Sequence, residues 1–177
     1  MMRTARLLFA AALVCGCSHA VGAGASMPQP EVDRGIELYN ARNFQEAAQV
    51  LEAATQASSG NARALTYLGL SRLELKQPGS AEEAFRKAIE ADGNYAQAHY
   101  GLGLALGYLG QRDKAIASLE KAVALDSGNA YAHYHLGLAL QQSGATDRAL
   151  LHLQRFLELA PEAPEAPRVR ALLSQLR

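Results

Sequence analysis

Cysteine is scarce in this chain of 177 residues, since its two cysteines, Cys15 and Cys17, both lie within the first twenty positions. The rest of the chain can therefore hold no internal disulfide, no thiolate metal site and no cysteine nucleophile. Net charge is also absent, because Lys and Arg together number 17, as do Asp and Glu. Without an overall positive field, nucleic-acid binding is not expected.

A long hydrophobic run is missing as well. The apolar run LLFAAALV (7–14) is too short to span a bilayer, and it follows the basic residues Arg3 and Arg6. This order of basic start and short apolar run is typical of a secretory signal peptide. An amphipathic first helix of the fold is the alternative, but the run has no polar face.

The end of this run resembles the lipobox of bacterial lipoproteins. In LVCGC, Gly16 precedes Cys17, although Val14 stands where leucine is usual. The resemblance implies a signal peptide over residues 1–16, a lipid anchor on Cys17 and a flexible tether over residues 17–27. In enteric lipoproteins, an aspartate directly after the lipidated cysteine signals retention at the inner membrane. Ser18 stands at this position here, so we expect an outer-membrane lipoprotein facing the periplasm. Cleavage after Ala25 is the alternative, and it would leave a soluble periplasmic or secreted protein.

The body of the chain repeats itself every 34 residues. The stretches AHYGLGLAL (98–106) and AHYHLGLAL (132–140) differ at one position, and the same period continues on both sides. Three series of equivalent residues follow it: Gly35, Gly69, Gly103 and Gly137; Ala47, Ala81, Ala115 and Ala149; and Leu51, Phe85, Leu119 and Leu153. We expect each glycine to allow two helices to approach, with the alanine twelve residues later on the other side of the contact. Such a period indicates a tandem array.

Each repeat reads as two helices. Apolar residues recur at a spacing near 3.6 residues, and no window alternates with the period of two that a β-strand requires. The sequence predicts side-chain caps at four helix starts: Asn61, Asn129, Ser80 (paired with Glu83 in a capping box), and Thr146 or Asp147.

These units resemble the tetratricopeptide (TPR) repeat, whose pattern is W-x2-L-G-x2-Y, then A-x3-F, then P. The Leu-Gly pair recurs three times, the A-x3-F element is intact at Ala81 to Phe85, and the final proline survives as Pro161. The resemblance implies an all-α fold, a right-handed α-solenoid of four helix hairpins. Its units are 28–61, 62–95, 96–129 and 130–163. A short amphipathic segment, 164–177, resembles the capping helix that closes such arrays.

No catalytic constellation is found in the chain. His99 and His133 occupy equivalent repeat positions and read as packing variants, while His133 and His135 lie on different faces of a helix. The run GLGLALG (101–107) lacks the preceding strand and the GK[ST] ending of a phosphate loop. We therefore expect no enzyme activity, no cofactor, no metal and no small-molecule substrate.

The TPR resemblance implies that the first helix of each unit lines a concave groove that binds a protein or peptide. The groove positions carried over to this chain are Tyr39, Asn40, Arg63, Thr66, Leu70, Glu74, Gln97, Tyr100, Leu104, Tyr108, Tyr131, Tyr134, Leu138, Gln141 and Gln142. We expect the rings of Tyr100, Tyr108, Tyr131 and Tyr134 to form one contiguous patch for a partner; the alternative is that the groove tyrosines partly fill gaps between adjacent first helices. The groove lacks the lysines with which chaperone adaptors of this family bind carboxylates.

The function that these features predict is a non-enzymatic interaction scaffold. It is expected to be lipid-anchored at the cell envelope and to assist the assembly of an envelope complex, of pilus or secretion type. An accessory subunit of an envelope enzyme is the other alternative.

Overall fold

The computed structural model describes residues 29–57 and 60–176. This part of the chain is all-α, with nine helices and no strand. The helices are α1 (Gln29–Asn40), α2 (Phe44–Ala57), α3 (Ala62–Glu74), α4 (Pro78–Ala91), α5 (Ala96–Tyr108), α6 (Arg112–Leu125), α7 (Ala130–Gln142), α8 (Thr146–Leu159) and α9 (Ala166–Leu176). The predicted signal peptide, Cys17, Ala25 and the tether all lie outside the described residues.

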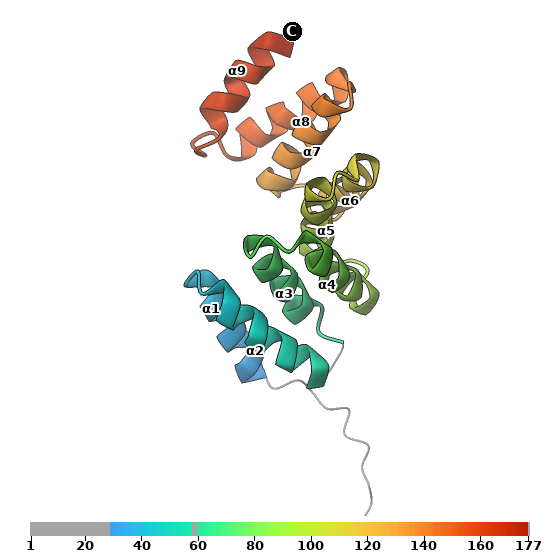
Figure 1. Cartoon of the computed structure of the whole chain (residues 1–177). Helices are drawn as coiled ribbons and strands as arrows, with labels where there is room; N and C mark the ends of the chain where they lie inside the picture. The colour runs from blue at the N-terminus through green and yellow to red at the C-terminus, as the bar shows by residue number, and fades with distance from the viewer. Residues whose placement is uncertain (1–28, 58–59, 177) are drawn as a thin grey trace, which may run out of the picture.

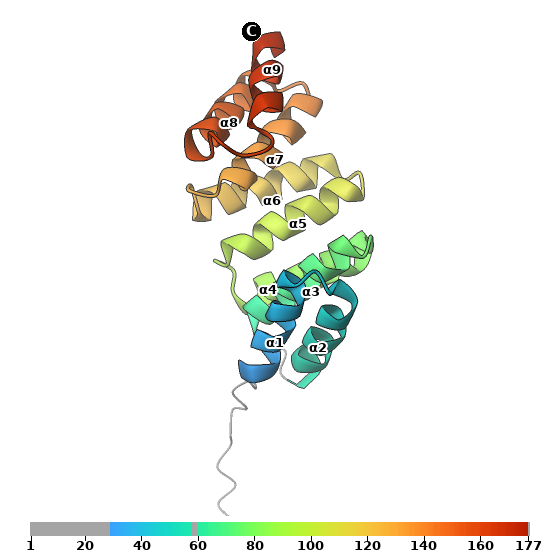
Figure 2. The same ribbon diagram turned by 90° about the vertical axis from the view of Figure 1, so that its left-hand side faces the viewer.

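The helices form four hairpins that stack one on another, from α1 and α2 at the bottom of Figure 1 to α9 at the top. Each first helix (α1, α3, α5, α7) packs on its own partner and on the neighbouring first helices, and α3, α5 and α7 also pack on the second helix before them. Within the described residues, the backbones of successive second helices do not approach in this way, although Arg148 of α8 pairs with Glu120 of α6. The row of first helices is therefore the shorter, concave side of the array, and Figure 2 shows the stack turned by a quarter. The predicted all-α solenoid is confirmed.

The repeated glycines allow close helix approach within each hairpin. A Cβ placed on Gly35, Gly69, Gly103 or Gly137 would lie 2.5, 2.7, 2.6 or 2.7 Å from the side chain of Leu51, Phe85, Leu119 or Leu153. Such distances are too short for carbon atoms in contact, so only glycine fits. The principal partner is thus the residue sixteen positions later. The predicted alanine twelve positions later contributes a backbone contact at Gly103, where the Ala115 carbonyl would lie 3.3 Å from the added Cβ.

One residue of each intra-hairpin turn adopts the left-handed backbone conformation. These residues recur with the repeat period and have φ angles of 63° at Arg42, 61° at Lys76, 73° at Gly110 and 84° at Gly144. Only the last two are glycines, the residue type that adopts this conformation without strain. The first two units therefore carry a strained residue where the last two do not.

Two of the four predicted helix caps are confirmed. The side-chain oxygens of Asn61 and Asn129 accept hydrogen bonds from the backbone N–H groups of Ala64 and Ala132, each at 2.9 Å. These bonds satisfy N–H groups that have no partner within the helix. Asn129 caps α7, the first helix of the fourth hairpin.

The other two predicted caps are wrong. Helix α4 begins at Pro78, so Ser80 and Glu83 lie inside it, and the residue before it, Gln77, makes no side-chain cap. Proline at the first helical position has no N–H group to satisfy, so the helix starts there without a cap. In the same way α8 begins at Thr146 and follows Ala145, whose side chain cannot form a cap.

The last helix covers the end of the array. Val169 and Leu173 of α9 are buried and belong to one cluster with Leu153 and Phe156 of α8. The apolar stripe predicted for this segment thus packs on the fourth hairpin, as expected for a terminal cap. None of the helices in residues 29–57 and 60–176 has the length and apolar character needed to cross a membrane.

Candidate functional site

The predicted groove residues differ widely in exposure on the concave face. Six are exposed: Asn40, Arg63, Glu74, Tyr108, Tyr131 and Gln142. Seven are partly buried between neighbouring first helices: Tyr39, Leu70, Gln97, Tyr100, Leu104, Leu138 and Gln141. Two are buried: Thr66 and Tyr134. The accessible part of the predicted surface therefore consists of the first two groups.

Thr66 and Tyr134 are too deeply buried to meet a partner. Thr66 has no exposed surface, and its hydroxyl has no hydrogen-bond partner in the described part of the chain. Tyr134 is 7% exposed, because its ring packs 5.1 Å from the ring of Phe156 in α8. The prediction that these two residues line the accessible groove is therefore wrong, since both side chains fill space between the helices.

The tyrosines do not form the single patch of rings that was expected. Tyr134 is buried, and the ring of His135 lies 5.0 Å from it and 5.9 Å from the ring of Tyr100. His135, which the sequence reasoning left out, therefore separates the two tyrosines. Tyr131 lies at the C-terminal end of the face, where its hydroxyl donates a 3.2 Å hydrogen bond to Glu165.

Tyr108 is the most exposed aromatic residue of this face. Its side chain is 69% exposed at the end of α5, and it lines a cavity of about 310 Å³ together with Leu104, Leu138 and Gln142. It also lines a second cavity of about 180 Å³, whose other walls include Lys76. Tyr108 thus stands between two hollows, where the ring of an interface anchor gains apolar contact.

Tyr100 and His135, two ionisable residues of this face, favour their neutral forms. Burial, followed by the neighbouring phenols of Tyr131, Tyr39 and Tyr108, raises the pKa of Tyr100 well above its ordinary value of 10. Burial also lowers the pKa of His135 below 6.5, which Glu165 opposes only in part. A neutral surface with apolar hollows suits a partner that is held by apolar contact more than by charge.

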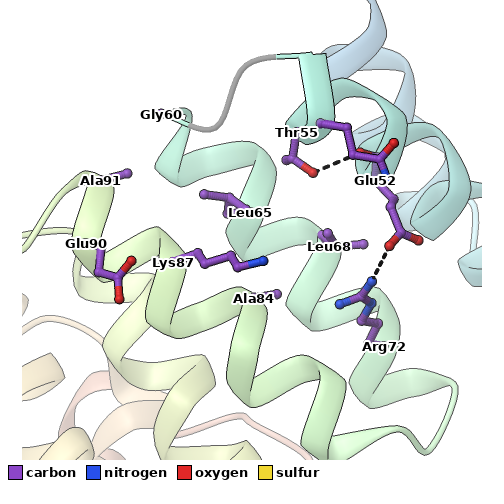
Figure 3. Close-up of a pocket in the computed structure, with 11 residues that line it drawn as sticks. Glu52, Thr55, Gly60, Leu65, Leu68, Arg72, Ala84, Lys87, Glu90 and Ala91 are labelled. Carbon is purple, nitrogen blue, oxygen red and sulfur yellow. Dashed lines mark hydrogen bonds and ion pairs between the residues drawn. The ribbon is translucent and has the colours of Figure 1, made fainter.

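A larger cavity lies on the opposite face of the array. It measures about 590 Å³ between α2 and α4, with Leu65 and Leu68 of α3 among its lining residues. Figure 3 shows Lys87 pointing into it, while Arg72 and Glu52 are joined by a 2.8 Å ion pair at one end. None of the predicted groove residues lines it, so the concave face and this cavity are separate features.

The same gap recurs one unit later. A cavity of about 430 Å³ lies between α4 and α6, and its walls include His99 of α5 and Ser118 of α6. These residues stand 34 positions after Leu65 and Ala84 of the first gap. Ala84 and Ser118, which line the two cavities, both have small side chains.

Two histidines occupy the corresponding place in the fourth hairpin. His133 of α7 and His152 of α8 stand 34 positions after His99 and Ser118, and their Nδ1 atoms lie 3.0 Å apart. Burial lowers the pKa of both rings below the ordinary value of 6.5, and the other charge effects are smaller. The sequence reasoning missed this pair, although the repeat register places both residues on facing helices. No group of three or more His, Cys, Asp or Glu side chains that could hold a metal is found among the described residues.

The fold and the concave face define an α-helical repeat array with a surface for a protein or peptide. The family model described as tetratricopeptide repeat matches residues 32–98 and 100–164. The chain therefore belongs to the TPR family, whose members are typically protein-interaction scaffolds without an activity of their own. No curated protein has significant sequence similarity to this chain.

Solved TPR structures resemble the chain over most of its length. The crystal structure of MamA is 26% identical, with a TM-score of 0.70 over 80% of this chain and 82% of that chain. The second TPR domain of human RPAP3, solved in complex with an HSP70 peptide, is 26% identical, with a TM-score of 0.59 over 62% of this chain and 91% of that chain. Pseudomonas aeruginosa pilF is 21% identical, with a TM-score of 0.72 over 83% of this chain and 66% of that chain, a likeness of fold alone.

Proposed function

We propose that the protein is a non-enzymatic scaffold that binds a segment of a partner protein in its concave groove. The observation that carries this proposal is the position of Tyr108, which is 69% exposed and lines two cavities. An exposed aromatic ring beside apolar hollows costs solvation in the free protein and gains contact when a partner covers it. Leu104 and Leu138 offer the apolar floor, and Gln142 offers hydrogen bonds at the edge.

The proposed partner segment is extended or helical and mainly uncharged at its centre. The peptide complex of the RPAP3 domain supports peptide binding by a chain of this fold. The exposed cation Arg63 is already paired with Asp33 at 3.2 Å, so it is not free to hold a carboxylate. Salt should therefore weaken the complex only slightly.

We place the scaffold at the cell envelope as a further part of this proposal. The basic start, the short apolar run and the Gly16-Cys17 pair support a lipid anchor on Cys17 in the outer membrane, with the array facing the periplasm. Assistance in assembling an envelope complex, of pilus or secretion type, is the role proposed for it. The alternatives are a soluble periplasmic or secreted adaptor cleaved after Ala25, and an accessory subunit of an envelope enzyme.

Site-specific photocrosslinking tests the groove. A photoreactive residue at position 108 should crosslink one envelope protein in cells, whereas the same residue at position 151 should not. Leu151 is the matched control, because it is 65% exposed and lies on the second helix α8. With that partner purified, Tyr108→Ala should weaken binding about 5- to 30-fold and Leu151→Ala less than twofold. Equal losses in the two variants would place the binding surface elsewhere.

Mass spectrometry of the mature protein tests the anchor. The wild-type chain should begin at Cys17 with a lipid mass and stay with membranes in high salt, and Cys17→Ala should lose both properties. A mature chain that begins at Ser26 would support the soluble adaptor instead. The groove measurement uses purified protein, so its outcome does not depend on this one.

A further inference from the structure

The last hairpin brings two imidazole rings together in a chelating arrangement. Nδ1 of His133 lies 3.0 Å from Nδ1 of His152, and the ring centroids are 5.2 Å apart with an angle of 34° between the planes. His133 is 6% exposed, while His152 is only partly buried. The two Nδ1 atoms are joined by a hydrogen bond, and the solvent can reach this pair from the His152 side.

A backbone carbonyl orients the His133 ring. Its Nε2 atom lies 3.3 Å from the carbonyl oxygen of Ser127. A carbonyl only accepts hydrogen bonds, so Nε2 carries the hydrogen and the neutral ring keeps its lone pair on Nδ1, which accepts a hydrogen bond from Nδ1–H of His152. An ion bound to both Nδ1 atoms takes the place of that hydrogen, and the neutral His152 ring then carries its hydrogen on Nε2. Metal-binding histidines are commonly held in this way, with the second ring nitrogen donating to a carbonyl or carboxylate.

The spacing of the two nitrogens indicates the kind of metal. If the rings keep the spacing of their hydrogen bond, two nitrogens 3.0 Å apart, each about 2.0 Å from an ion, subtend an angle of about 97° at the ion. This is close to the right angle of square-planar and octahedral sites and smaller than the tetrahedral angle that zinc prefers. We propose that His133 and His152 form a bidentate site for a divalent copper or nickel ion, with water at the remaining positions.

The other hairpins show which part of the site each histidine supplies. In the second hairpin the equivalent residues are Leu65 and Ala84, which cannot bind a metal. In the third hairpin His99 is oriented as His133 is, with Nε2 3.0 Å from the Gly93 carbonyl, but its partner is Ser118. The third hairpin therefore lacks only one imidazole.

Nickel binding to the full chain tests the proposal. The probe is Ni²⁺ alone, added at pH 7.5 to untagged protein whose thiols are capped with iodoacetamide, and the readout is the bound nickel per chain by calorimetry. His152→Ser and His133→Leu should each lose one bound nickel relative to wild type. Serine and leucine are the residues at the equivalent positions 118 and 65, so the helices can accommodate them.

A gain of binding complements these losses. Ser118→His should bind one nickel more than wild type, because it completes the pair with His99. Nickel should also raise the melting temperature of wild type by about 3 °C more than that of His152→Ser, since binding to the folded state stabilises it. Equal nickel stoichiometry in wild type and His152→Ser, or no extra nickel in Ser118→His, would overturn the assignment.

Discussion

Gly101 of α5 lies against the ring of Phe85 in α4, so closely that a Cβ at position 101 would overlap the ring. Gly69 meets the same ring from α3, where an added Cβ would lie 2.7 Å away. The other hairpins place leucine at the position of Phe85 and carry Tyr67 and His135 at the position of Gly101. The larger side chain at position 85 is thus matched by glycine, the smallest residue, at position 101.

This pairing predicts a reversal of sign in a double-mutant cycle. Gly101→Ala should destabilise the wild type by about 1–3 kcal/mol, because the added methyl group overpacks against Phe85. In a Phe85→Leu background the same change should stabilise by about 0.5–1 kcal/mol, because alanine favours the helix over glycine. Urea denaturation of the four proteins measures both values. The same sign in both backgrounds would show that the two residues are independent.

Lys76→Gly is expected to stabilise the protein. Lys76 has a φ angle of 61°, whereas Gly110 and Gly144 occupy the equivalent turns of later hairpins. Glycine adopts this conformation without the Cβ strain of lysine, so we expect a gain of about 0.5–1 kcal/mol in the free energy of unfolding. Lys76→Ala is the control, because it removes the charge and keeps the strain. A similar gain in the alanine variant would assign the effect to charge.

Asn129→Ala should cost about 1 kcal/mol of stability, because it removes the hydrogen bond to the Ala132 N–H at the start of α7. Gln77→Ala is the matched control, since Gln77 precedes α4 and forms no side-chain cap. The control should change the free energy of unfolding by less than about 0.5 kcal/mol. Thermal and urea unfolding of both variants would detect the difference, and equal losses would contradict the cap.

Ionisation of Tyr100 should lower the stability of the protein at alkaline pH. Its pKa is raised in the folded state, so above pH 10 the unfolded chain loses this proton first. The contribution of Tyr100 to the free energy of unfolding is therefore fully present below pH 10, and it falls as the pH rises towards the pKa of the folded state. Between pH 9 and 11 wild type should lose about 1 kcal/mol more than Tyr100→Phe. Urea melts at the two pH values provide the comparison, and identical slopes would mean that Tyr100 ionises freely.

The repeat period made the fold predictable from sequence. Identical residues at a fixed spacing fix which positions face each other, and the glycine that recurs every 34 residues marks the tight contact of each hairpin. The caps predicted at Ser80 and at Thr146 or Asp147 were wrong because α4 and α8 begin without a side-chain cap. The register alone could not distinguish a groove residue such as Tyr108 from a buried one such as Tyr134, since exposure depends on how neighbouring first helices pack.

The His133–His152 pair shows a related limit. Neither histidine stands out in the sequence of its own helix. Packing of the two helices of the hairpin brings the Nδ1 atoms of these residues, nineteen positions apart, to a distance of 3.0 Å. Comparison of all four units at both positions is the sequence signal that could have found it, because only the last unit has histidine at each.

The unequal packing of the two rows of helices has a mechanical consequence. The backbones of neighbouring first helices approach one another along the row, while those of successive second helices within the described residues stand farther apart and α6 and α8 are joined by the Arg148–Glu120 ion pair. Bending would therefore stretch or compress the outer row at low energetic cost and leave the spacing along the inner row nearly constant. A load pulling on the two ends would pass from hairpin to hairpin through the first helices, since each of α3, α5 and α7 packs on both helices of the preceding hairpin, so α5, which holds Tyr100 and Tyr108, would carry part of that load.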